Sequence, residues 1–294
     1  MAVPAQERAP QGPGEALPTR PGPASVAWKI HRETVMLLGW GRAILLQFAH
    51  PAVAQGVADH SVFLNQPRAR LRRLRSTIEA MLALTFGDNA AAQDAADRIN
   101  AIHDRVRGQL RSSTSVFPAG TGYSAHDPKL LKWVHATLLD SFLLTYELCV
   151  APLSPEEKDR YCLESSSMEG LLGIPAGYLP RNLRQLQDYM EGMYRSGEIE
   201  ITEPAQTLAH EVLYPGRVFP LQPFLWLERL FTIGTLPAPI RSAYGFAWSA
   251  RQKKALAMWS GIIRGALPLV PPVLRYWKIA RVQEQSRLRT DRSS

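Results

Sequence analysis

A basic stretch and a histidine further along the chain have the residue types that could do chemistry. RARLRRLRST, residues 68–77, holds five arginines and ends in a threonine. If the stretch is helical, Arg73 and Thr77 lie one turn apart beside an apolar stripe, and most of the other arginines face water. An arginine at such a border needs an acceptor, which is a carboxylate, a carbonyl oxygen or an anionic ligand. The spacing therefore leaves open a salt-bridged border and a ligand pocket.

The second candidate is His103, in RINAIHDRVRG. On a helix over residues 89–108, Ala96, Ile99 and His103 form one stripe, so the imidazole leaves the apolar side of the helix. A lone histidine in this setting is commonly a hydrogen-bonded core residue. The alternative is a ligand of haem iron, because one imidazole in an apolar helical pocket is enough for haem, whereas zinc requires three or four ligands.

Two further histidines are weaker candidates for the same pocket. His135 shares its helical face with leucines and Phe142, and His50 follows an apolar run. No HExxH pair, ExxH pair, Gly-rich phosphate loop, GxSxG elbow or CxxC motif occurs in the sequence. The sequence therefore lacks the motifs that hydrolases, kinases, dinucleotide-binding proteins and di-iron proteins require. Nucleic-acid binding is also not expected, since the basic residues lack interleaved aromatics.

Composition describes an ordinary globular chain with an unusual charge. Of 294 residues, 46% are hydrophobic and 20% charged, while the net charge is +8. Such a balance favours an anionic partner or surface. The two cysteines, Cys149 and Cys162, are too few for a disulfide framework and favour a reducing compartment. The N-terminus shows no secretory signal, so we expect a cytoplasmic protein.

The most apolar stretch extends from Val35 to Val57. Its length invites a transmembrane interpretation, but Arg42, His50 and Pro51 interrupt it, and such groups are costly in hydrocarbon. We expect a buried helix that ends near Pro51.

The rest of the chain predicts one all-α domain with tails. Residues 1–24, rich in Pro and Gly, predict a disordered tail. Residues 25–281 form the helical domain, and 282–294 a basic tail. Asp127–Pro128 and the Ser154–Glu157 capping box open two helices. Further helices are expected over 68–86, 89–108, 181–196, 203–213, 221–233 and 240–265, with a loop over 109–126. An irregular helical bundle follows.

The order of several motifs is similar to that of a known family. LLGWGRAILLQFAHPAVAQGVADHSVF, RLRRLRSTIEAMLALTFG, RINAIHDRVRG, GYSAHDPKLLKWVHATLLDSFLLTYE and LPAPIRSAYGFAW succeed one another in the sequence. Together they resemble the MpaB-like oxygenases, whose best understood members are the latex-clearing rubber oxygenases. The resemblance covers the chain from about Ala27 to Arg281.

That resemblance implies a globin-like, haem b-containing oxygenase that uses dioxygen. The proximal iron ligand of the latex-clearing proteins matches His103, and their arginine and threonine beside the haem match Arg73 and Thr77. His135 and His50 follow as further cofactor-binding candidates. The chain departs from the latex-clearing proteins at two positions. Ser76 stands where they have a lysine that can cap the iron. Their catalytic glutamate has no counterpart here, and the polar groups available in the corresponding stretch are Asp59 and His60.

The expected function is therefore that of a cytoplasmic haem b oxygenase acting on a hydrophobic small molecule, alkenyl or lipid-like, with dioxygen. One alternative is a haem-binding or haem-sensing protein without turnover. Another is a cofactor-free helical protein bound peripherally to an anionic membrane through its basic C-terminus, from Arg275 to Arg292, which could also be a solvated tail. Rubber cleavage outside the cell is not expected, because the export signal is missing.

Overall fold

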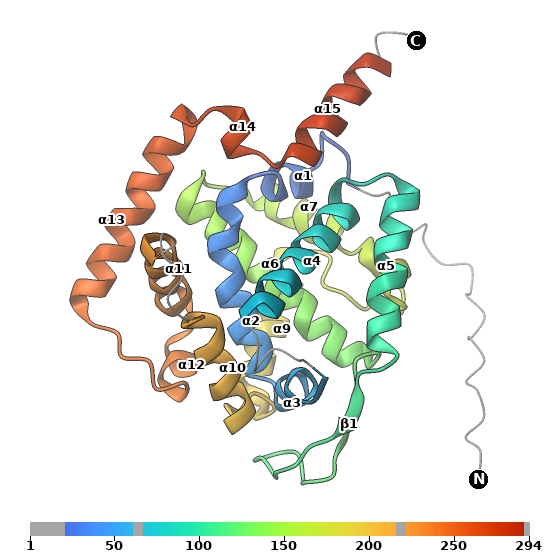
Figure 1. Cartoon of the computed structure of the whole chain (residues 1–294), viewed down its shortest axis with the longest axis vertical. Helices are drawn as coiled ribbons and strands as arrows, with labels where there is room; N and C mark the ends of the chain where they lie inside the picture. Colours follow the sequence, from blue (N-terminus) through green and yellow to red (C-terminus); the bar gives the residue numbers. More distant parts are fainter. Residues whose placement is uncertain (1–20, 61–66, 216–221, 291–294) are drawn as a thin grey trace.

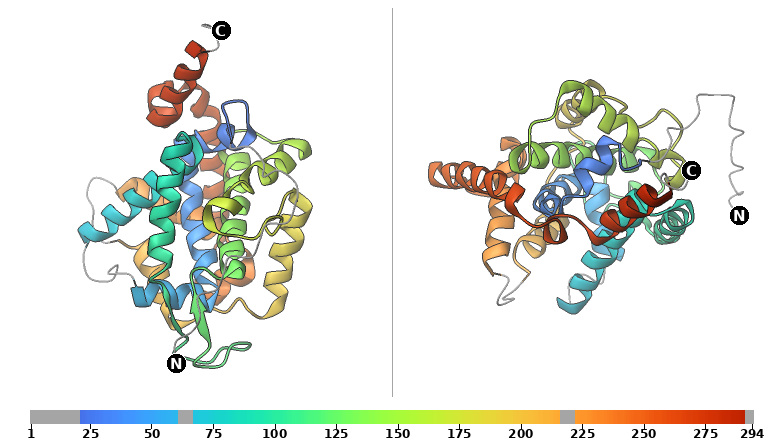
Figure 2. Two further views of the ribbon diagram at one scale, coloured as in Figure 1. Left: turned by 90° about the vertical axis from the view of Figure 1, so that its right-hand side faces the viewer. Right: turned by 90° about the horizontal axis from the view of Figure 1, so that it is seen from above.

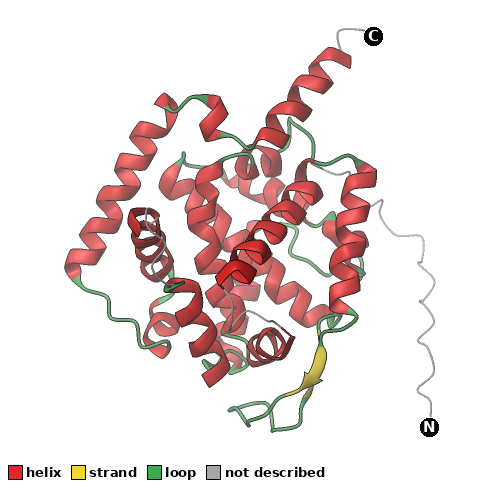
Figure 3. Cartoon of the chain, viewed as in Figure 1, coloured by secondary structure: helices red, strands yellow, loops and turns green. Residues whose placement is uncertain are grey.

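The computed structural model describes residues 21–60, 67–215 and 222–290, and the side chains of 67–74 and 286–290 lie outside this description. The tail predicted for residues 1–24 falls almost wholly outside it. The described chain is all-α, as expected, with one two-stranded sheet (Figure 3). The strands β1 (Arg107–Gln109) and β2 (Gly122–Ser124) pair antiparallel.

The helices have the following bounds: α1 (Val26–His31), η1 (Thr34–Gly39), α2 (Trp40–Phe48), α3 (Pro51–His60), α4 (Pro67–Phe86), α5 (Asn89–His103), α6 (Pro128–Cys149), α7 (Pro155–Ser165), α8 (Met168–Leu172), α9 (Leu183–Ser196), α10 (Glu203–Leu213), α11 (Gln222–Thr235), α12 (Ala238–Ala243), α13 (Ala250–Ala266), η3 (Leu267–Leu269), α14 (Pro272–Arg275) and α15 (Lys278–Thr290). Two predicted starts are confirmed. Asp127 caps α6 with Pro128 at its first position, and Ser154 and Glu157 form a capping box on α7.

Two predicted boundaries were wrong, and a third was right only at its end. The helix expected to reach residue 108 ends at His103, because the amide of Ala125 binds the carbonyl of Val106 and draws the chain into the hairpin. The helix expected over 240–265 is two, α12 and α13, separated where Gly245 adopts a φ of 75°. The helix predicted in the apolar stretch from Val35 to Val57 does end near Pro51, at Phe48 of α2, but η1 precedes it and Pro51 opens a further helix, α3.

The core surrounds α6, which lies in the middle of the molecule with α2 packed along it (Figure 1). Its fully buried side chains include Trp133 and Phe142. Arg42 of α2 is buried too, and it pairs with Asp140 of α6 at 2.6 Å. This pairing explains how a charge is tolerated within the apolar stretch. No described helix is long and apolar enough to cross a membrane.

Helices α4 and α5 form an antiparallel hairpin whose arms diverge from the turn at Gly87 and Asp88 (Figures 1 and 2). Near the turn the two helices are held together by a small cluster of Leu84, Ala95 and Ala96. The N-terminal half of α4 and the C-terminal half of α5, where the candidate site residues lie, are therefore placed on separate arms.

The segment around α14 is bonded to the part of the chain that joins α1 to η1. The guanidinium of Arg275 binds both oxygens of Glu33, a residue only 1% exposed. The amide of Trp277 donates to the carbonyl of Arg32, and the hydroxyl of Thr34 donates to two carbonyls of α14. These bonds fix α14 on η1 and aim α15 away from the body of the molecule (Figure 2).

Candidate functional site

His103 is the last residue of α5, and the chain leaves the helix directly after it. Its side chain is half-buried. The Nδ1 atom is buried without a hydrogen-bond partner among the described residues. Buried polar atoms are almost always paired, so an uncommitted ring nitrogen calls for an explanation, and a ligand is one.

The surroundings of His103 keep its ring neutral. Burial, and then the charge of His126, lower the pKa of His103 against the opposing effect of Asp104. The two imidazoles meet edge to face with 5.8 Å between their centroids. Nε2 of His126 lies 2.7 Å from the carboxylate of Asp104. Since a metal binds the neutral imidazole, this environment favours the form that can act as a ligand.

His135 lies in the middle of α6 and belongs to a different group. It is 9% exposed, and its Nε2 is buried with no partner in the described part of the chain. Burial, and then the charge of His31, lower its pKa to about 4. His135 is therefore neutral at physiological pH, and it also keeps a free ring nitrogen.

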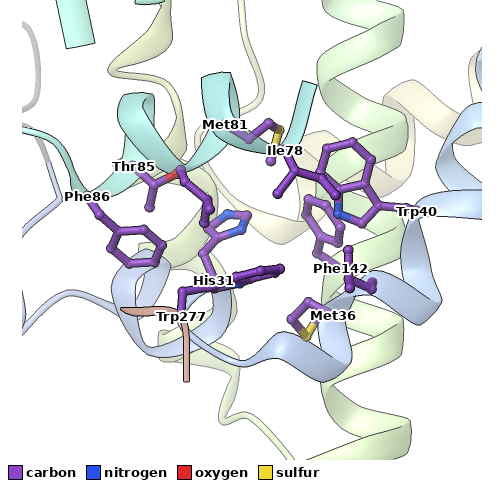
Figure 4. A pocket seen from close by; sticks show the side chains of 11 residues that line it. His31, Met36, Trp40, Ile78, Met81, Thr85, Phe86, Phe142 and Trp277 are labelled. Carbon is purple, nitrogen blue, oxygen red and sulfur yellow. The ribbon is translucent and has the colours of Figure 1, made fainter. Parts of the chain in front are cut away.

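His31, at the end of α1, lines an apolar cavity between α1, η1, α4 and α6 (Figure 4). Its Nε2 lies 3.1 Å from the hydroxyl of the buried Tyr161, and its ring meets Phe142 edge to face at 5.1 Å. Burial lowers the pKa of His31 to about 4. In this cavity the neutral imidazole of His31 and the hydroxyl of Thr85 thus stand among mostly apolar side chains.

The lining comes from four distant parts of the sequence, which are residues 31–40, residues 78–86, Phe142 and Trp277. Figure 4 shows Met36 and Trp40 on one side, Ile78 and Met81 of α4 on another, and Phe142 of α6 behind them. The cavity measures about 20 Å³, which is room for about one water molecule. The cavity is therefore too small for a substrate unless the side chains around it move.

The structure places Arg73 and Thr77 on the arm of α4 that diverges from α5. The side chain of Arg73 lies outside the described residues, so its direction stays a prediction. The side chain of Thr77 is exposed, next to Ile78, which faces the cavity. The structure thus brings His103 to His126 and His135 to His31, and it leaves Thr77 on the outer flank of α4.

His50 is buried at the start of α3 and has protein partners on both sides of its ring. Its Nδ1 accepts the amide of Ala52 at 3.2 Å, and its Nε2 lies 3.9 Å from the carboxylate of Glu198. Burial lowers its pKa to about 4, although Asp127 opposes this. Compared with His103 and His135, its ring nitrogens are less available to a cofactor.

Asp59, noted as an available polar group on α3, holds the hairpin against the bundle. Its carboxylate accepts the hydroxyl of Tyr123 at 2.6 Å and the amide of Gln55 at 2.9 Å, and it pairs with Arg111. Burial raises the pKa of Asp59, but these hydrogen bonds and the arginine outweigh it and leave the pKa lowered. Neighbouring His60 contacts the carbonyl of Arg107 at 3.1 Å.

Sequence reasoning missed His31 and Tyr161. His31 ends a helix of six residues, which is too short for a periodic pattern to reveal a buried face. Tyr161 lies in a mostly polar helix, PEEKDRYCLES. The available signal was the pair Tyr161–Cys162, two residues of low polarity within that charged helix, and both are fully buried.

The donor chemistry of these residues fits a haem group. Haem iron needs one protein donor on its proximal side, and a neutral imidazole with an uncommitted nitrogen supplies it. His103 meets both conditions, and the unpartnered Nε2 of His135 is a second polar atom that a ligand could satisfy. Within the described ranges no group of three or more His, Cys, Asp or Glu side chains could hold a metal ion.

Two mycobacterial proteins are similar to the chain over most of its length. The uncharacterized proteins Mb2261 of Mycobacterium bovis and Rv2237 of Mycobacterium tuberculosis are each 25% identical to it over 232 residues, which cover 78% of this chain and 87% of theirs. No solved structure matches it.

A family comparison identifies the chain more specifically. Residues 28–265 match the catalytic domain described as "ER-bound oxygenase mpaB/B'/Rubber oxygenase". The matched region contains His31, His103 and His135, and it begins and ends within the described helices α1 and α13. The chain therefore belongs to the ER-bound oxygenase mpaB/B'/rubber oxygenase family.

Proposed function

We propose that this oxygenase-family chain depends on haem b and acts with dioxygen on an apolar substrate such as an alkene or a lipid. The observation that supports it best is His103: a half-buried, neutral imidazole with a ring nitrogen that no described group binds. In the resemblance to the latex-clearing proteins, this histidine matches the proximal iron ligand. The bound haem would supply the redox centre for oxygen chemistry.

The residues around His103 orient its ring and favour its neutral form. Asp104 holds His126 at 2.7 Å, and the edge of His126 limits how the ring of His103 can turn. Such partners next to a ligand set its orientation and basicity. From the resemblance alone we also propose that Arg73 and Thr77 stabilise negative charge on a haem propionate or on the reacting oxygen, which requires the exposed side chain of Thr77 to turn toward the cofactor.

The apolar cavity next to His31 supports an apolar substrate. Its lining includes Met36 and Met81, whose unbranched side chains adapt their shape more readily than other core residues. Changes of rotamer at these methionines would enlarge a cavity that now fits about one water. His135 and His50 remain further candidates for contact with the cofactor, and His135 has the freer ring. We also propose that the protein works in the cytoplasm.

The absorption spectrum of the purified protein, expressed with a haem supply, tests the proposal. We expect a Soret band typical of haem b in the wild type, and its loss or shift in His103→Ala. His210→Ala is the matched control, because His210 is an exposed histidine on α10. It should leave the band unchanged.

Two results would contradict this assignment. A colourless wild type that cannot be reconstituted with haem would remove the cofactor and leave a helical binding protein. An unchanged band in His103→Ala, together with a lost band in His135→Ala, would move the ligand to α6. Oxygen consumption with a panel of alkenes and lipids then separates an oxygenase from a haem sensor without turnover.

A further inference from the structure

The net positive charge of the chain is concentrated at its C-terminal end. Residues 1–250 contain 24 basic and 24 acidic side chains, whereas residues 251–294 contain ten basic and two acidic ones. The whole net charge of +8 therefore belongs to the last 44 residues. A field of one sign confined to one part of a protein attracts a partner of opposite charge to that part.

The same segment exposes an apolar tip, defined here as Pro268–Leu274, which extends from η3 into α14. Leu269 is 84% exposed, Val273 59% and Leu274 68%. The prolines between them are exposed as well. Monomeric proteins rarely expose several large apolar side chains side by side, and such patches mark interaction sites.

The tip is held rigidly rather than left loose. Arg275, the residue directly after it, is bound to the buried Glu33 through both carboxylate oxygens. Thr34 donates to the carbonyl of Leu274 at 3.1 Å. The three apolar side chains are therefore kept in solvent by a firm attachment at their base, and little conformational entropy remains to be lost when they bind.

One exposed cation lies beside the tip, and three more lie farther away on the same C-terminal segment. Lys278 follows the tip, whereas Arg251, Lys253 and Lys254 lie in the first turns of α13, at the end of that helix farther from the tip (Figure 1). None of the four has an ion pair within the described residues. The apolar surface continues on α13 through Met258 and Ile262, which are 54% and 47% exposed.

A groove opens beside the tip. It lies between α4 and α15, measures about 570 Å³, and is lined mostly by apolar side chains, among them Trp277, Ile279 and Val282. Figure 2 shows α15 projecting from the end of the body where α14 also lies. The apolar tip, the groove and the exposed Lys278 therefore share one end of the molecule.

We propose that this end docks on an anionic lipid bilayer, with Leu269, Val273 and Leu274 inserted among the acyl chains and Lys278 at the headgroups. An apolar tip beside an unpaired lysine, on a segment that carries the whole net charge of the chain, is complementary to a surface that is apolar inside and negative outside. A soluble acidic protein would match the charge but would offer no interior for three exposed aliphatic side chains. The docking is independent of the haem assignment, since it uses none of the candidate site residues.

Sedimentation of the full chain with vesicles tests the docking. Wild type should sediment with phosphatidylcholine and phosphatidylserine in equal parts, and much less with phosphatidylcholine alone. In the double variant Leu269→Ser/Leu274→Ser, the partition constant should fall about tenfold or more, because each leucine loses several buried methylene or methyl groups. Lys278→Glu and added salt should weaken binding as well.

Val116→Ser is the matched control. Val116 is 46% exposed and lies in the loop of the β1–β2 hairpin, at the opposite end of the molecule (Figure 1). It should bind vesicles as wild type does. Equal binding to both kinds of vesicle, no binding by wild type, or an equal loss in Val116→Ser would each overturn the proposal.

A fluorescent label locates the contact. Cys149 and Cys162 are buried, and burial raises the pKa of both thiols to about 12, so they react slowly with labels. An environment-sensitive dye on Leu269→Cys should shift its emission to the blue on anionic vesicles, and the same dye on Val116→Cys should not. Lipid-free self-association that the double leucine variant abolishes would instead assign the tip to a second copy of the chain and contradict docking on lipid.

The haem spectrum separates this test from that of the proposed function. The double leucine variant should keep the Soret band of the wild type, because neither leucine approaches a candidate ligand. A colourless protein that still docks would refute the haem assignment alone, and a coloured protein that ignores vesicles would refute the docking alone.

Discussion

The hydroxyl of Tyr161 lies 3.1 Å from Nε2 of His31, and this hydrogen bond joins α7 to the end of α1 beside the apolar cavity. The two residues are 130 positions apart in sequence. Tyr161 is fully buried, and its hydroxyl has polar partners in the imidazole of His31 and the side chain of Ser165.

Tyr161→Phe should lower the free energy of unfolding by about 1–2 kcal/mol, because the change removes a hydrogen bond and leaves a ring nitrogen of His31 without this partner. Urea denaturation followed by circular dichroism measures the effect. Tyr214→Phe is the control, since Tyr214 is 45% exposed, and it should stay within about 0.5 kcal/mol of wild type. Equal effects in the two variants would show that the His31–Tyr161 bond contributes no net stability.

Stability should fall as the pH drops from about 7 to about 5. Burial holds the pKa of His31, His50 and His135 at about 4 in the folded chain, whereas in the unfolded chain they titrate near 6.5. Between these values the unfolded chain binds protons that the folded chain does not, so the stabilisation is complete above about pH 6.5 and is lost toward pH 4.

Urea midpoints measured across that pH range test this dependence. His31→Phe removes one of the three histidines and should make the slope of the unfolding free energy against pH shallower. His210→Ala should leave the slope unchanged, because His210 is exposed. A flat profile in the wild type would mean that the buried histidines accept protons while folded.

Phe142 packs against two other rings at the cavity, His31 at 5.1 Å and Trp40 at 6.2 Å between centroids. It is 1% exposed. Phe142→Ala should therefore cost about 3–5 kcal/mol of unfolding free energy and enlarge the cavity. Phe224→Ala, at a side chain 46% exposed, should cost about 0.5 kcal/mol or less. A cost below 1 kcal/mol at Phe142 would show that the site collapses to fill the space.

Much of the fold follows from local signals in the sequence. Asp127–Pro128 and Ser154–Glu157 mark helix starts, because capping groups and proline act within one turn of the chain. The end of α5 did not follow, since the β1–β2 pairing that stops the helix joins residues about fifteen positions apart. Gly245 likewise looks permissible in a helix, and only its positive φ shows the break.

The candidate site was harder to predict than the fold. The stripe of Ala96, Ile99 and His103 gave the half-buried position of the histidine, because helical periodicity is local. The contact between His103 and His126 depends on how the hairpin returns to α5, which no periodicity contains. The cavity depends on α1, η1, α4 and α6 meeting, so His31 gave no signal that pointed to a pocket. For the direction of Arg73 the sequence prediction still stands alone.

Arg275 and Glu33 provide the last prediction. Arg275→Ala should cost about 3–5 kcal/mol, because it leaves the buried carboxylate of Glu33 without its partner. It should also speed proteolysis of the segment that follows α14. Arg195→Ala, at an exposed pair with Glu191, should cost about 0.5 kcal/mol or less. The double variant Glu33→Leu/Arg275→Leu should recover most of the lost stability, since an apolar pair of similar size needs no compensating charge. If the double variant is as unstable as Arg275→Ala, the segment depends on the geometry of the two-point ion pair and not on relief of an unpaired buried charge.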